Sequence, residues 1–213
     1  MPYHLGASCN PISGRSEFWL CKSPPPIRAE IMSFFPSLPV DAGVRHIASF
    51  NPAAGQALIR LHTAALRNDG PLTAKDKELI AAYVSGLNGC HYCYGVHSQT
   101  AQAFGVPEDL LAQLMVDIDT APIDDALKPL MRYARKLTQE PSRMTEADAQ
   151  AVFQAGWSEI ALHEAVLTIC LFNFMNRLLD GHGITGHAAL YETRGKALKE
   201  NGYDPLLALL QPK

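Results

Sequence analysis

The sequence predicts an all-α fold. Residues that start helices, such as Asn51, Thr73 and Ser158, recur along the chain, and apolar residues follow them at helical spacing. Segments with the alternating pattern of a strand are few. With 213 residues, of which 47% are hydrophobic, the chain can bury the core of one domain. We place this helical domain at residues 27–213.

Residues 1–26 have a different character. They include Pro24-Pro25-Pro26 and further prolines and glycines, and no helical or strand period connects them. This composition predicts an irregular amino-terminal arm. The apolar group of Phe18, Trp19 and Leu20 favours packing of the arm against some surface.

The first expected helix of the domain follows Asn51-Pro52, which places a capping side chain ahead of a proline at the first helical position. Its apolar stripe runs to Leu66. Thr73 starts the second helix, because its hydroxyl can cap the chain and Asp76 lies in the first turn. This helix extends to about Leu87.

Glycine and proline divide the middle of the chain. Asn88-Gly89 breaks the second helix, and a third helix over residues 90–104 stops at the glycine that follows. Pro107 opens a fourth helix. Pro122 leads into a fifth, which ends before Pro141.

Three more helices complete the domain. Thr145 caps a short helix that ends near Ala155, and Ser158 caps a long one. Residues 160–179 of the long helix are apolar on almost every face, which predicts that it is the buried centre of the bundle. A final amphipathic helix covers about residues 187–200.

Charge and hydropathy argue against two classes of partner. The formal net charge is -3 and charged residues are spread along the chain, so no basic stripe can follow a phosphate backbone. No segment reaches about 18 apolar residues without a charge, and the amino terminus lacks the apolar core of a secretory signal. We therefore expect no nucleic-acid or membrane partner and a cytoplasmic location.

The five cysteines lie at positions 9, 21, 90, 93 and 170. An odd number in a chain of this length is a poor disulfide framework. A close pair in a reducing compartment more often carries redox chemistry or a metal. Neither a Walker A loop nor a Gly-x-Gly-x-x-Gly segment after a strand is present, so we expect no cofactor. The redox equivalents are then expected to come from the cysteines.

Cys90, Cys93 and His97 form a Cys-x-x-Cys-x-x-x-His segment at the start of the third expected helix. At about 100° per residue they lie near 0°, 300° and 340°, within one sector of roughly 60°. The three side chains therefore share a face. A helix N-terminus carries unpaired N–H groups and about half a positive charge, which favours the thiolate form of a cysteine in the first turn.

This arrangement predicts thiol chemistry on a peroxide. His97, one turn after Cys93, can take the thiol proton. Glu78, on the preceding helix, can fold back to orient the imidazole and take up that proton. A thiolate that attacks a peroxide oxygen becomes a sulfenic acid, and a second cysteine converts this acid into a disulfide. Turnover then requires an external dithiol.

Glu78, Cys90, Cys93 and His97 match in spacing the signature of the AhpD-like alkylhydroperoxidases in the carboxymuconolactone decarboxylase superfamily, and the chain resembles this family. The segment Asn173-x-x-Asn176-Arg177-x-x-Asp180-Gly181 is similar to a late motif of its peroxidase-related branch. The resemblance covers residues 27 to about 205.

The resemblance implies an AhpD-like helical bundle that acts as a peroxiredoxin-type hydroperoxide reductase. It implies that Cys93 attacks the peroxide, Cys90 resolves the sulfenic acid, His97 relays the proton and Glu78 receives it. It also implies a homo-oligomer (dimer, trimer or hexamer), a hydroperoxide substrate and a reductant that is an external dithiol or a lipoylated protein. The best-known members carry a histidine directly before the second cysteine, where this chain has Tyr92.

Other interpretations of the same residues stay open. The cysteine pair with His91 or His97 offers ligand types that zinc accepts, which would make a redox- or zinc-responsive binding module. A decarboxylase of the same superfamily, with another substrate, would not use the pair. Taken alone, Glu78 would be interpreted as a solvated or capping residue.

Residues outside the motif carry weaker predictions. Cys170 lies in the apolar long helix and is expected to be a small core residue. The polar residues of the late motif favour a structural role, with Arg177 paired to Asp180 or across a subunit interface. His182 and His187 are weaker candidates for lining the site from another helix.

Overall fold

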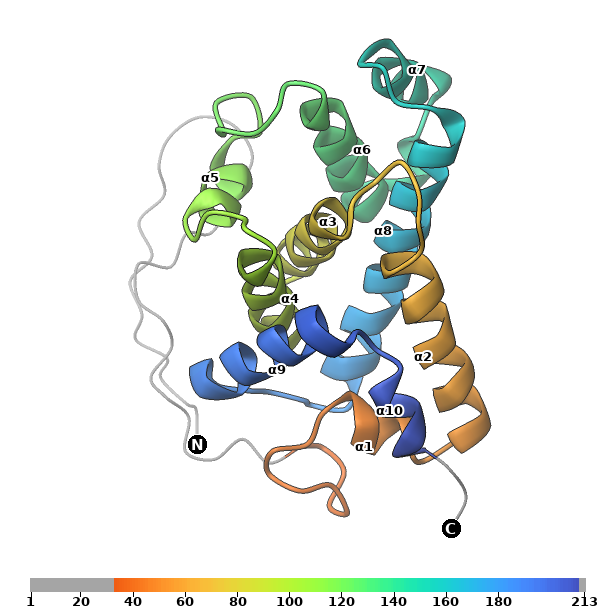
Figure 1. Cartoon of the computed structure of the whole chain (residues 1–213), viewed down its shortest axis with the longest axis vertical. Coiled ribbons are helices and arrows are strands. Elements are labelled where there is room, and N and C mark those ends of the chain that lie inside the picture. Colours follow the sequence, from red (N-terminus) through yellow and green to blue (C-terminus); the bar gives the residue numbers. More distant parts are fainter. Residues whose placement is uncertain (1–32, 211–213) are drawn as a thin grey trace, which may run out of the picture. The chain divides into compact units, whose positions relative to one another are not determined.

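A computed structural model describes residues 33–210, which form ten α-helices and one short 3-10 helix and, within that range, no strand (Figure 1). The predicted all-α fold class is confirmed. The predicted arm of residues 1–26, with Cys9 and Cys21, lies outside the described residues, as does the predicted domain start at residue 27. Within residues 33–210 no helix combines the length and hydropathy needed to cross a membrane.

The eight helices predicted from the sequence all occur, and two short ones, the first and the last, were not predicted. Four or five residues carry too little periodicity to be recognised as a helix. A 3-10 helix covers Pro141–Arg143. The α-helices are α1 (Val44–Ala48), α2 (Pro52–Leu66), α3 (Ala74–Leu87), α4 (His91–Ala103), α5 (Leu110–Val116), α6 (Leu127–Gln139), α7 (Glu146–Gln154), α8 (Glu159–Gly181), α9 (Ala188–Asn201) and α10 (Pro205–Ala208).

Helices α5 and α6 begin later than their prolines predict. The chain after Pro107 forms a turn, closed by the Leu110 backbone N–H, which donates to the Pro107 carbonyl at 3.2 Å. The φ angle of proline suits a β-turn as well as the first turn of a helix. The position of a proline alone therefore does not show whether a helix begins there.

A reciprocal cap fixes the start of α3. Thr73 Oγ1 accepts from the Asp76 backbone N–H at 3.2 Å, and Asp76 Oδ2 accepts from the Thr73 backbone N–H at 3.1 Å. Two N–H groups are thereby satisfied near the helix start. The capping start predicted at Thr73 is confirmed, and it sets the register in which Glu78 follows in the next turn.

The centre of the fold is α3, which packs against α4, α5, α6 and α8 (Figure 1). Its residues Asp76–Ser85 are all buried. The prediction that α8 forms the buried centre is therefore wrong. Charged residues in the first turns of α3 hid its central position from the hydrophobic pattern, because buried charges require partners that sequence spacing does not reveal.

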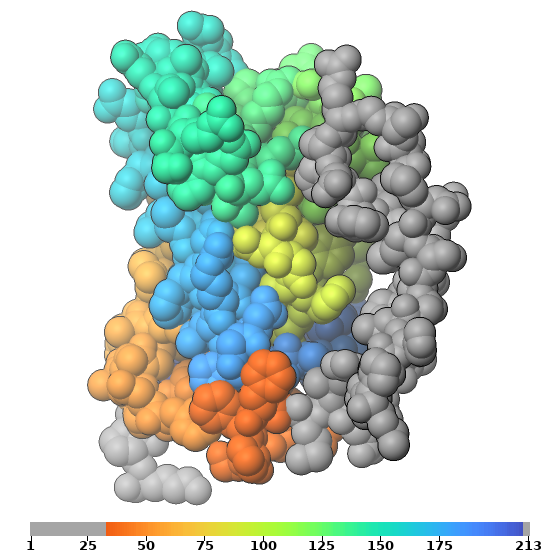
Figure 2. Space-filling model, turned by 180° about the vertical axis from the view of Figure 1, so that it is seen from behind, coloured from red at the N-terminus to blue at the C-terminus, as the bar shows by residue number. Residues whose placement is uncertain are grey.

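Helix α8 has one buried and one exposed side. Ile160, Cys170 and Phe174 lie on the exposed side, where the side chain of Ile160 is 64% exposed. Figure 2 shows α8 in blue in the middle of the face seen from behind. The prediction that Cys170 is a core residue is wrong, because a helix that is apolar all round does not indicate which side meets the core.

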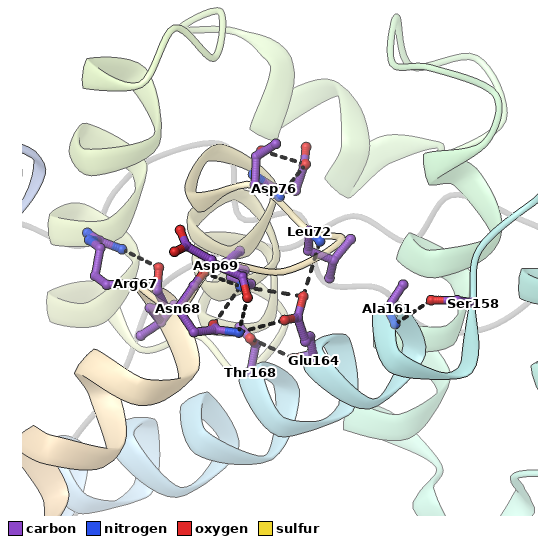
Figure 3. Close-up of polar contacts among 12 residues, drawn as sticks. Arg67, Asn68, Asp69, Leu72, Asp76, Ser158, Ala161, Glu164 and Thr168 are labelled. Carbon is purple, nitrogen blue, oxygen red and sulfur yellow. Dashed lines mark hydrogen bonds and ion pairs between the residues drawn. The ribbon is translucent and has the colours of Figure 1, made fainter.

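Buried polar contacts join the start of α3 to α8 (Figure 3). Lys77 is fully buried, and its Nζ lies 3.4 Å from Glu164 Oε2 and 2.7 Å from Asn68 Oδ1. Glu164 also accepts from Asn68 Nδ2 at 2.6 Å and from the Leu72 backbone N–H at 3.1 Å. The loop between α2 and α3 is thus held on α8 by charged hydrogen bonds.

This ion pair predicts a large, non-additive stability effect. Lys77→Met leaves the Glu164 carboxylate buried without a cation, and we expect it to lower the free energy of unfolding by about 3 kcal/mol or more in denaturant titrations. Lys77→Met combined with Glu164→Leu should cost less than the sum of the two single variants. Additive costs would contradict the pairing.

Candidate functional site

The turn before Cys90 is a tight reversal between α3 and α4. Gly89 adopts a φ of 69°, which few residues other than glycine accept. The Cys90 backbone N–H donates to the Ser85 carbonyl at 3.0 Å, and Cys90 then occupies the N-cap position of α4. Cys93 follows in the first turn of α4, as predicted from the Asn88-Gly89 break.

Asparagines of α8 hold this turn in place. Asn88 Nδ2 donates to Asn176 Oδ1 at 2.8 Å and to Asn173 Oδ1 at 3.2 Å. Asn176 Nδ2 donates to Ser85 Oγ at 3.0 Å. This is a structural role for the late motif, as expected. Arg177 donates to Asn173, and within residues 33–210 it makes no ion pair with Asp180.

Both cysteines are nearly inaccessible, and their thiols interact. Cys90 is fully buried and Cys93 is 3% exposed. The pKa of Cys90 is raised, first because its thiol hydrogen bonds to the Cys93 side chain and second because it is buried. The raised pKa favours the protonated thiol of Cys90.

Glu78 is fully buried between α3 and its neighbours and has three partners. His97 Nδ1 lies 2.7 Å from Glu78 Oε2. Arg67 Nη2 donates to Glu78 Oε1 at 2.6 Å, and Tyr203 Oη donates to the same oxygen at 3.0 Å. The expected meeting of Glu78 and His97 therefore occurs, and it leaves His97 Nε2 available to the cavity described below.

Two opposing effects set the charge of Glu78. Burial favours the neutral acid, but the nearby His97 and Arg67 outweigh it, so the pKa of Glu78 is below its usual value. Glu78 is thus an ionised carboxylate in the interior. A buried carboxylate of this kind can orient an imidazole and stabilise its protonated form.

Arg67, Tyr203 and His62 belong to this cluster, and none of them was predicted from the sequence. Arg67 lies 5.0 Å from the Tyr203 ring centroid and 5.3 Å from that of Phe104. His62 is packed against Tyr203, with ring centroids 5.2 Å apart. All three lie outside the Cys-x-x-Cys-x-x-x-His segment and belong to no motif, so residue spacing along the chain could not identify them.

A cavity of about 540 Å³ opens beside Cys93. Cys93, His97 and His62 lie on its buried side, and the rest of the wall is mostly apolar. Cys90 does not line this cavity but a smaller one of about 230 Å³. The two cysteines therefore line different cavities, and a small molecule in the larger cavity would meet Cys93.

The remaining histidines and Tyr92 are placed as follows. Tyr92 lines the larger cavity, and its hydroxyl accepts from Arg194. His91 is exposed on another side of α4. His182 stacks on Phe35 with centroids 4.4 Å apart, and His187 is the exposed N-cap of α9, so neither lines the cavity. Within residues 33–210 no three His, Cys, Asp or Glu side chains gather as a metal site would require.

Comparison with known proteins agrees with this fold. The carboxymuconolactone decarboxylase family matches residues 52–140, the segment that contains Glu78, both paired cysteines and His97. No curated protein sequence matches the chain significantly.

Three solved structures have a similar fold. An uncharacterized peroxidase-related protein from Ralstonia eutropha JMP134, described as an alkylhydroperoxidase AhpD core, is 21% identical with a TM-score of 0.63 over 70% of this chain and 78% of its own. An uncharacterized peroxidase-related protein from Silicibacter sp. TM1040 is 22% identical with a TM-score of 0.65 over 71% and 79%. A protein of unknown function from Agrobacterium tumefaciens, described as an AhpD antioxidant defence protein, is 20% identical with a TM-score of 0.55 over 66% and 94%. At these identities the likeness establishes the AhpD-like helical fold, which confirms the predicted bundle.

The buried His62 predicts an acid-dependent loss of stability. Burial lowers the pKa of His62 from 6.5 to about 4. The unfolded chain therefore binds the proton first, and the fold loses about 3 kcal/mol as the pH falls from 6.5 to 4. Denaturant unfolding at several pH values should show this loss in the wild type relative to His62→Phe, which keeps the ring contacts. Parallel pH curves for the two proteins would contradict it.

Proposed function

We propose that this chain is a thiol-dependent hydroperoxide reductase of the carboxymuconolactone decarboxylase superfamily, a proposal supported by the family match at residues 52–140 and by the AhpD-like fold. The observation that carries the proposal is the arrangement around Cys93. Cys93 lines a cavity together with His97, and Glu78, which does not line that cavity, lies 2.7 Å from His97. Nucleophile, base and orienting carboxylate thus lie in sequence.

In the proposed first step, His97 takes the proton of the Cys93 thiol. The thiolate attacks the terminal oxygen of the hydroperoxide, so an S–O bond forms while the O–O bond breaks. The alkoxide that leaves takes the proton from His97 and departs as an alcohol. Cys93 is oxidised to a sulfenic acid, and the peroxide is reduced by two electrons.

In the second step, Cys90 resolves the sulfenic acid. Its sulfur attacks Cys93, the S–S bond forms and the S–O bond breaks, and the Cys90 proton leaves with the hydroxide as water. The positions of Cys90, at the N-cap of α4, and Cys93, in the first turn of the same helix, support this attack. An external dithiol or a lipoylated protein then supplies two electrons and two protons to restore the pair.

We propose a role for Glu78 that differs from the one implied by the resemblance. The resemblance makes Glu78 the final proton acceptor, whereas its lowered pKa favours a carboxylate that stays ionised. We assign the moving proton to His97 and an orienting and charge-stabilising role to Glu78. Arg67 and Tyr203 are assigned as positioning residues, because both hold the Glu78 carboxylate. Arg67 does not line the cavity, and Tyr203 lines it while its hydroxyl donates to Glu78.

Two alternatives make different predictions. A decarboxylase of the superfamily with another substrate is supported by the family match at residues 52–140, and its activity would survive alkylation of the thiols. A redox- or zinc-responsive binding module would retain one zinc per chain after dialysis. The cytoplasmic location and the homo-oligomer implied by the resemblance remain predictions.

The roles of the two cysteines predict distinct defects. Cys93→Ser should reduce peroxide consumption with a dihydrolipoyl-type reductant to the background rate, because the nucleophile is lost. Without a reductant, Cys90→Ser should consume about one equivalent of hydroperoxide and stop as a sulfenic acid, which a dimedone probe detects. Cys170→Ser, on the exposed side of α8, is the matched control and should turn over normally. Full activity of Cys93→Ser would refute the proposal.

Loss of the Glu78 charge should slow the chemistry, at some cost in stability because Arg67 loses its anionic partner. Glu78→Gln can keep hydrogen bonds to its partners but no longer stabilises a proton on His97, so we expect kcat/KM to fall about 100-fold. The pH profile of kcat/KM should also change, because an ionised carboxylate no longer lies beside the imidazole. The exposed Glu108→Gln is the control. An unchanged pH profile would contradict the assigned role.

A further inference from the structure

The cavity beside Cys93 has a buried end and an open end. The buried end holds Cys93, His97 and His62, while the open end is formed by residues of α1, α9 and α10, among them the exposed Pro205 and Leu209. Its volume of about 540 Å³ lies in the range that holds drug-sized ligands. Hydrogen peroxide, close to water in size, would occupy a small part of it.

Two arginines, one from α1 and one from α9, lie at this cavity. Arg45, from α1, is exposed, and Arg194, from α9, is partly buried beside it. Among the described residues neither forms an ion pair. Burial and the positive charge of Arg45 both lower the pKa of Arg194, and Asp41 offsets this only in part. The pair would therefore be stabilised by an anion.

The backbone leaves room for this arrangement. A side chain on Gly43 would overlap Arg194 Nη1 and the Tyr92 hydroxyl, so glycine allows the guanidinium to approach Tyr92 closely. Arg194 donates to the Tyr92 hydroxyl, and its CZ atom lies 5.5 Å from the Tyr92 ring centroid. Position 92 thus helps to hold an arginine at the cavity, beside the residue that carries the proposed nucleophile.

The buried end offers a hydrogen-bond acceptor. His62 Nδ1 lies 2.8 Å from the Leu58 carbonyl oxygen, which assigns the proton to Nδ1. Nε2 is then an acceptor, and it has no hydrogen-bond partner among residues 33–210. His62 lines the cavity together with Cys93. A hydroperoxide group at this end could donate its O–H to His62 while presenting its oxygen to sulfur.

We propose that this cavity takes the hydroperoxide of a free long-chain fatty acid, with its carboxylate at Arg45 and Arg194 and its chain along the apolar wall. The inference rests on the proposed peroxide reduction and names its substrate class. An apolar cavity with paired cations at its open end matches an amphipathic anion. The reaction of the O–OH group is the one given above, with Cys93 oxidised and an alcohol released.

A binding measurement separates this inference from the chemistry. Calorimetry on the reduced wild-type protein compares palmitate with its methyl ester, neither of which can oxidise a thiol. We expect the acid to bind at least about tenfold more tightly, because charge-assisted hydrogen bonds to arginine are lost in the ester. Arg45→Gln and Arg194→Gln should reduce this preference, while Arg60→Gln, on the exposed side of α2, should not.

Kinetics then test the substrate class. With a dihydrolipoyl-type reductant, the hydroperoxide of linoleic acid should have a kcat/KM about tenfold above that of its methyl ester, mainly through KM. The Arg45→Gln and Arg194→Gln variants should bring this ratio toward one.

The two failures are distinguishable. Equal binding and equal kcat/KM for acid and ester would overturn the inference, even if both peroxides are reduced. Absence of peroxide reduction would overturn the proposed function and, with it, the assignment of a hydroperoxide as the ligand. A preference that Arg45→Gln and Arg194→Gln leave unchanged in folded protein would overturn the role of the arginines.

Discussion

The buried carboxylate of Glu78 constrains the architecture around it. A charge in the interior is tolerated only with partners, and here Arg67, His97 and Tyr203 supply them from the ends of α2 and α9 and from α4. Three segments far apart in the sequence must therefore meet at one point of α3. The cavity beside Cys93 lies at this meeting point, so the charge network and the site share one framework.

Polar contacts at both ends of α3 keep Glu78 in register. Lys77 meets Glu164 near the start, and Asn88 meets Asn176 at the end, and in both cases the partner belongs to α8. Between these points the helices pack through apolar side chains. Directional bonds at two places resist rotation or sliding of α3 on α8, which apolar packing alone tolerates more readily. Rotation would separate Glu78 from His97.

Sequence reasoning predicted the fold well where signals are local. Capping residues, prolines and glycines predicted eight helices. The sequence also predicted that Glu78 meets His97, and that Cys93 and His97 lie on one helix that starts at Cys90. Three-dimensional features could not be predicted in this way. The central position of α3, the exposed Cys170 and the contributions of Arg67, His62 and Tyr203 depend on how helices pack, and periodicity along one helix does not encode its neighbours.

The central claim is that Cys93 and Cys90 act as one two-electron centre toward a hydroperoxide. It is tested most directly by adding one equivalent of organic hydroperoxide to the fully reduced protein, counting free thiols and mapping the product by peptide mass spectrometry. We expect the loss of two thiols, a Cys90–Cys93 disulfide and about one equivalent of alcohol. Unchanged thiols in folded protein, or a bound zinc that protects both cysteines, would contradict it.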